Sequence, residues 1–131
     1  MEQLRKEFPD YTFEALFGGK VMSISAMVLE AKDEFEKKFF IPVSAESFFQ
    51  ECWEPAIEEL GLKWTKVFSV GIDLIEEDFP FVLEELSKIK EWAKENLPEE
   101  KRIKIIERIE LIETEVPIAF THRDGLVIFI G

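Results

Sequence analysis

A chain of 131 residues with a formal charge of -12 is long enough for one compact domain and too acidic to favour phosphate backbones or anionic lipid surfaces. Apolar residues make up 47% of the sequence, and the 13 Phe and 3 Trp can fill a substantial core. These values indicate a single acidic domain over residues 1–131, exclude nucleic acid and membranes as expected partners, and favour a basic protein instead.

The first third of the chain alternates between apolar and polar residues, as half-buried strands do. The pattern predicts a strand near 11–17, a second over 21–30 after the turn at Gly18 and Gly19, and a third near 35–43. Because short connections join neighbouring antiparallel strands, these three are expected to form a meander.

A helix is predicted over 45–60, with Ser44 as its N-cap and Gly61 at its C-terminal end. Pro55 either kinks this helix or opens a second, shorter one, because proline has no N–H to donate within a helix. Alternating apolar residues over 67–74 then predict a fourth strand.

The second half of the chain begins with a helix over 78–93, which has the clearest 3.6-residue apolar stripe in the sequence. Another helix is predicted over 99–112, although its many isoleucines also fit a strand. The Asp-Gly pair at 124–125 predicts a terminal hairpin between strands at 117–121 and 126–130. The last strand has apolar residues on both faces, so it is expected in the centre of the sheet.

Strands and helices in this order predict the α+β class. The expected architecture is a mostly antiparallel sheet, made of the N-terminal three-stranded meander and the C-terminal hairpin, with two or three helices packed on one face. No internal repeat or linker marks a boundary within the chain.

Few residues could carry catalysis or bind a metal or cofactor. The single cysteine, Cys52, falls on a predicted core face, where a thiol stays protonated, and the single histidine, His122, falls in a predicted turn. Neither the usual metal-ligand spacings nor a glycine-rich phosphate loop occurs. We therefore expect a protein that is not an enzyme and that has no cofactor and no metal. One cysteine and a start without a leader pattern favour the cytoplasm.

Carboxylates gather at the start of the predicted helix over 78–93 and towards its end. Those near the start also stabilise the helix dipole, but Glu91 and Glu95 repel each other across one turn. A local cost without a local benefit is typical of a surface that faces a partner. The predicted partner-binding residues are Glu76, Glu77, Asp78, Glu84, Glu85, Glu91 and Glu95.

Small size, negative charge and the absence of catalytic motifs favour a non-catalytic protein-binding domain. Size and charge suit an inhibitor or immunity-type protein that neutralises a basic enzyme such as a nuclease. The alternative is a small-molecule-binding module with a pocket lined by Phe and Trp, although filling the core is the simpler use of those residues. A homo-oligomer that pairs exposed edge strands is a further hypothesis.

Overall fold

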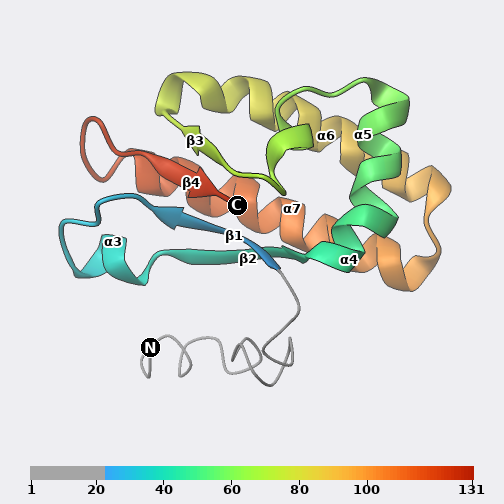
Figure 1. Cartoon of the computed structure of the whole chain (residues 1–131), viewed down its shortest axis with the longest axis horizontal. Coiled ribbons are helices and arrows are strands. Elements are labelled where there is room, and N and C mark those ends of the chain that lie inside the picture. The colour runs from blue at the N-terminus through green and yellow to red at the C-terminus, as the bar shows by residue number, and fades with distance from the viewer. Residues whose placement is uncertain (1–22) are drawn as a thin grey trace.

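The computed structural model describes residues 23–131, so the predicted strand near 11–17 lies outside the described residues. The described part has the predicted α+β architecture (Figure 1). The strands are β1 (Ser23–Val28), β2 (Phe40–Ala45), β3 (Ile72–Leu74) and β4 (Ile128–Ile130). The helical elements are α3 (Glu34–Lys38), α4 (Glu46–Phe48), the π-helical η2 (Phe49–Trp53), α5 (Glu54–Leu60), the 3-10 turns η3 (Thr65–Val67) and η4 (Glu76–Asp78), α6 (Phe79–Asn96) and α7 (Glu99–Phe120).

The four strands form one sheet in the order β2-β1-β4-β3, and all neighbouring pairs are antiparallel. Ile130 of β4 lies opposite Ala26 of β1 and opposite Ile72 of β3, which confirms that the last strand is central. Of the predicted meander, the pairing of the second strand with the third is confirmed by β1 and β2, and β1 has β4 as its other neighbour.

The third predicted strand, near 35–43, is wrong in its first part. Residues 34–38 form α3 because the side chain of Asp33 caps the turn and accepts the N–H of Glu36 at 3.0 Å. Phe35 and Phe39 are four residues apart, a spacing that fits a helical turn as well as a strand. The strand β2 then begins at Phe40.

The predicted C-terminal hairpin is also wrong, because residues 117–120 are the last turn of α7. The buried side chains of Ile112, Val116, Ala119 and Phe120 continue the apolar stripe of that helix. The free energy gained by burying this stripe outweighs the loss of one helical hydrogen bond at Pro117, which has no N–H to donate. The strand β4 pairs with β1 and β3 instead.

The remaining helices follow the sequence pattern closely. The predicted helix over 45–60 forms as α4, η2 and α5, and Pro55 lies in the first turn of α5, as the second alternative required. Gly61 ends α5 with φ +65°, whereas Ser44 lies in β2 and makes no N-cap bond. Of the predicted strand over 67–74, the last three residues form β3.

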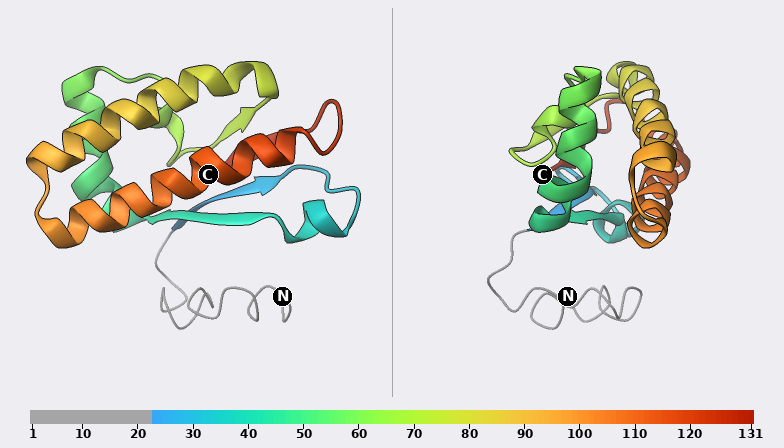
Figure 2. Two further views of the ribbon diagram at one scale, coloured as in Figure 1. Left: turned by 180° about the vertical axis from the view of Figure 1, so that it is seen from behind. Right: turned by 90° about the vertical axis from the view of Figure 1, so that its right-hand side faces the viewer.

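Helices α6 and α7 lie side by side over one face of the sheet (Figure 2). Leu86, Ile89 and Ile109 of these helices are fully buried, as are Ile128 and Ile130 of β4. Burial of this apolar surface is the main contribution to stability. No helix among residues 23–131 is long and apolar enough to cross a membrane.

Two glycines provide a test of backbone constraints. Gly71, before β3, has φ +111°, and a Cβ there would lie 3.1 Å from the ring of Phe129, whereas Gly61 has φ +65° and no atom within 4 Å. We expect Gly71→Ala to lower the free energy of unfolding by more than Gly61→Ala, for which about 1 kcal/mol is usual. Urea denaturation compares the two variants. Equal losses would show that Phe129 and the φ angle do not constrain Gly71.

Candidate protein-binding surface

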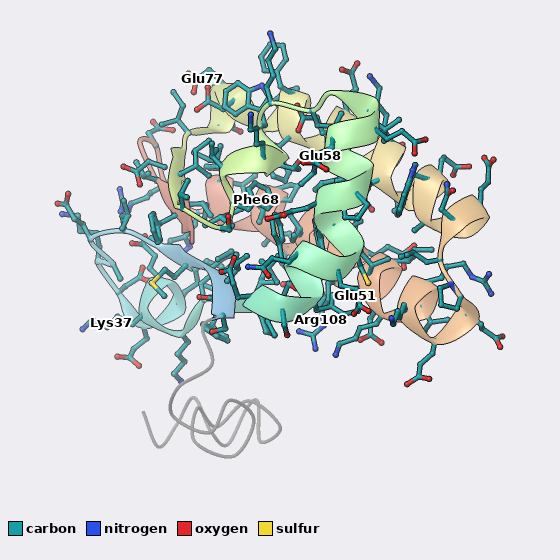
Figure 3. All side chains as sticks on the ribbon, turned by 45° about the vertical axis from the view of Figure 1, so that its right-hand side comes forward. Lys37, Glu51, Glu58, Phe68, Glu77 and Arg108 are labelled. Atoms are coloured by element: carbon teal, nitrogen blue, oxygen red, sulfur yellow. The ribbon has the colours of Figure 1, made fainter. Side chains whose placement is uncertain are left out.

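Five of the seven predicted partner-binding carboxylates are exposed, three on the outer face of α6 and two in the turn before it. The apolar stripe of this helix packs into the core, so positions on the opposite side face solvent. Glu84, Glu91 and Glu95 are exposed there, and Glu76 and Glu77 are exposed in the preceding turn η4. Figure 3 shows Glu77 at the outer edge of the molecule. Asp78 is partly buried, and its Oδ2 accepts the N–H of Ile75 at 3.2 Å.

Ion pairing is uneven along this face. Glu91 pairs with Lys94 at 3.0 Å, and the exposed Lys88 lies between Glu84 and Glu91 in the sequence. Within residues 23–131, the other exposed carboxylates of the face form no ion pair, and these are Glu76, Glu77, Glu84 and Glu95. Three of these four lie around the start of α6, so the uncompensated charge is concentrated there.

Glu85 does not face solvent, so its place on the predicted partner-binding surface is wrong. The residue is only 7% exposed. Its carboxylate accepts the backbone N–H groups of Lys63 at 2.9 Å, Trp64 at 3.0 Å and Thr65 at 2.8 Å, and also the hydroxyl of Thr65 at 2.8 Å. Burial raises the pKa of Glu85, but these donors together hold its pKa below the ordinary value. The ionised carboxylate therefore fixes a loop 20 residues earlier in the chain.

The loop that Glu85 holds carries Trp64, which stacks on Phe81 of α6. The ring centroids are 5.8 Å apart and the ring planes differ by 6°. Phe81 is 57% exposed and lies between Glu77 and Glu84 along the chain. We call Trp64, Glu76, Glu77, Phe81 and Glu84 the aromatic–acidic surface.

Sequence reasoning missed the aromatic part of this surface. The apolar stripe of α6 includes Phe79 and Val82, and Phe81 falls outside it. A large aromatic residue at a polar position of an amphipathic helix is the signal that could have identified it. Trp64 belongs to the surface because its loop packs against α6, and no pattern in the neighbouring sequence indicates that contact.

A second polar cluster joins the β1–β2 connection to the loop between α7 and β4. Glu36 is 1% exposed and accepts two hydrogen bonds from Arg123, at 2.8 Å and 3.2 Å. Nε2 of His122 lies 2.6 Å from Oδ2 of Asp33, and the imidazole ring stacks on Phe35 with centroids 4.5 Å apart. His122 lies in a turn, as predicted, and this paired arrangement was not anticipated.

The same cluster could in principle hold a metal ion. Asp33, Glu36 and His122 each offer one ligand atom, and these atoms lie within 4.8 Å of one another. However, Arg123 already binds both oxygens of Glu36, so a cation would lie beside a guanidinium. The arrangement is explained by ion pairing, and we assign no metal to it.

Other groups with chemical potential lie in the core or on open surface. Cys52 is fully buried, as predicted, and burial raises the pKa of its thiol. Phe49, Trp53 and Phe68 pack against one another in the interior, with centroids 5.5 Å and 6.4 Å apart. An open depression of about 400 Å³ lies near Glu76 and has a single aromatic residue, Phe120, in its lining. This depression is not the Phe- and Trp-lined pocket of the small-molecule hypothesis.

Comparisons with known proteins do not assign the chain to a family. No family model, curated protein or solved structure matches it. A function therefore has to be inferred from the residues described above.

Replacement of Glu85 tests the buried carboxylate. We expect Glu85→Gln to lower the free energy of unfolding by about 1–3 kcal/mol, because the amide places donors where the loop already supplies N–H groups. The matched control is Glu84→Gln, an exposed neighbour, for which a change within about 0.5 kcal/mol is expected. Urea denaturation of both variants at neutral pH gives the comparison. Similar values for the two would show that Glu85 does not secure the loop.

Acid is expected to weaken the cluster around Glu36. Arg123 holds the pKa of Glu36 below its ordinary value of 4.5, and the backbone N–H of Glu36 and then His122 lower the pKa of Asp33 from 3.8. A carboxyl group whose pKa is lower in the folded chain than in the unfolded chain stabilises the fold at pH values above its ordinary pKa. This stabilisation is lost as the pH falls through the lowered pKa.

The variant Arg123→Met tests this pH dependence. The stability advantage of the wild type over the variant should be largest at neutral pH and should shrink as the pH falls below the ordinary carboxyl value of 4.5. Urea unfolding at a series of pH values measures that difference. A difference that stays constant with pH would contradict the proposed ion pair.

Proposed function

We propose that this protein is non-catalytic and binds a basic protein through its aromatic–acidic surface. The observation that carries the proposal is the exposed ring of Phe81 between carboxylates that have no cationic partner among residues 23–131. An aromatic anchor within a charged rim is typical of the residues that dominate protein interfaces. The formal charge of -12 adds long-range attraction for a cationic partner and repels nucleic acid.

The partner class that fits best is a basic enzyme that acts on a polyanion, such as a nuclease. The substrate groove of such an enzyme is positively charged, so an acidic protein can occupy it and exclude the substrate. The proposed role is therefore that of an inhibitor or immunity-type protein, and size and charge support it. The single buried Cys52 suits the reducing cytoplasm.

The absence of catalysis is part of the proposal. Its support is that Cys52 is buried in apolar surroundings and that His122 is engaged by Asp33 at 2.6 Å. A nucleophile needs a base within hydrogen-bond reach, and among residues 23–131 the hydrogen bond of His122 Nε2 is to Asp33 and not to Cys52.

Charge reversal tests the proposal. The wild-type protein is used to isolate a partner from native extract, and the purified partner is then titrated by calorimetry at low and high salt. We expect binding to weaken with salt and to weaken more than about tenfold in the variant Glu76→Lys/Glu77→Lys/Glu84→Lys. If the partner is an enzyme, its activity should fall when the wild-type protein is added.

The matched control is Glu99→Lys/Glu107→Lys/Glu115→Lys, which reverses three exposed carboxylates on α7. Each triple variant changes the net charge from -12 to -6, because every substitution adds two charges. The two variants therefore differ in the position of the changes and not in total charge. Equal affinity of the two variants, or binding that is indifferent to salt, would contradict the proposal.

A further inference from the structure

The exposed face of Phe81 and the carboxylates beside it have the chemistry of a receptor for one planar cation. We infer that this part of the aromatic–acidic surface binds an arginine side chain of the partner. The inference rests on the proposed function and goes further, because it names the residue type that the partner must present.

The aromatic pair forms a flat and accessible surface. Trp64 and Phe81 are nearly parallel, with ring planes 6° apart and centroids at 5.8 Å, and Phe81 remains 57% exposed. A guanidinium group is planar and weakly hydrated, so it can stack on such a ring. Stacking of this kind contributes about 0.5–1 kcal/mol at an exposed site and more when water is excluded.

The neighbouring carboxylates supply the second half of the recognition. Glu84 follows Phe81 by three residues within α6, so the two occupy neighbouring positions on the helix surface, and Glu77 lies in the turn η4 that leads into the helix. Neither carboxylate is in an ion pair within residues 23–131, and both are exposed. A carboxylate can accept two parallel hydrogen bonds from a guanidinium that rests on the ring.

Lysine would match the charge but not the geometry. An ammonium group is compact and strongly hydrated, so it gains less from a flat ring and cannot form a bidentate pair with a carboxylate. The exposed Lys63 and Lys66 lie one residue before and two residues after Trp64, whereas Glu77 and Glu84 lie before and after Phe81, so a cation is expected on the Phe81 side of the aromatic pair. The surface should therefore distinguish arginine from lysine.

The receptor is formed before a partner arrives. The carboxylate of Glu85 accepts the backbone N–H of Trp64 at 3.0 Å and that of Thr65 at 2.8 Å, which fixes the loop against α6 one helical turn after Phe81. A surface that is already ordered loses little conformational entropy on binding. Trp64 thus also provides a spectroscopic reporter for the site.

Three short peptides, acetylated and amidated, test the preference. They share one glycine-based sequence and carry two arginines, two lysines or two citrullines, the last being planar but uncharged. The indole N–H signals of the protein are followed by NMR during each titration. We expect the arginine peptide to shift the Trp64 signal and to bind at least about threefold more tightly than the lysine peptide, and the citrulline peptide to cause no shift.

Trp53 and Trp92 serve as internal controls, because their indole nitrogens are buried and have no hydrogen-bond partner within the described chain. Their signals should remain unchanged during the titrations. Equal affinity for the arginine and lysine peptides, or shifts at all three indoles, would overturn the inference.

A pair of variants separates the aromatic ring from the general charge. Phe81→Ala should weaken binding of the arginine peptide at least about threefold. Ile103→Ala, which removes a side chain of the same 57% exposure on α7, should leave it unchanged. Circular dichroism establishes that both variants are folded before they are compared.

The two proposals can fail separately. A natural basic partner that is sensitive to Glu76→Lys/Glu77→Lys/Glu84→Lys but indifferent to Phe81→Ala would remove the arginine receptor and retain the proposed function. A partner that is indifferent to both variants would remove both proposals.

Discussion

The buried carboxylate of Glu85 is the interaction on which the proposed surface depends. It accepts hydrogen bonds from three consecutive backbone N–H groups, of Lys63, Trp64 and Thr65, and so replaces the water that these groups would lose on burial. Without this acceptor the loop before η3 would leave the buried Thr65 unsatisfied. Because Trp64 belongs to the same loop, the interaction that satisfies the backbone also places an aromatic ring on the surface.

The elements that could be predicted from the sequence are those whose buried residues follow a regular pattern of apolar positions along a short stretch of chain. The helix α6 and the central strand β4 have apolar patterns that fit a single structure, the first amphipathic and the second apolar on both faces. The sequence predicts strands at 35–38 and 117–120 because short runs with aromatic or β-branched residues fit both the helical and the strand spacing. The local cap from Asp33, three residues before Glu36, decided the structure of the first segment, and the burial of Phe120 in the core decided that of the second.

The charged part of the candidate surface was predictable for the same reason. Residues opposite the apolar stripe of α6 must face solvent, and this places Glu84 and Glu91 correctly. Glu85 sits at the border of the stripe, and its burial depends on donors that lie more than one element away. The pairing of Asp33 with His122 spans 89 positions of the chain, so no spacing within a segment could indicate it.

The place of β4 in the sheet has a consequence for synthesis of the chain on the ribosome. β1 and β3 are not hydrogen-bonded to each other, and β4, the latest of the four in the sequence, is the strand that bridges them. Until β4 has left the exit tunnel, the β1–β2 hairpin and β3 each keep an unpaired edge that can recruit another strand. Completion of the sheet is therefore expected to wait for β4, and chains that stop before Ile128 should need chaperones to avoid aggregation.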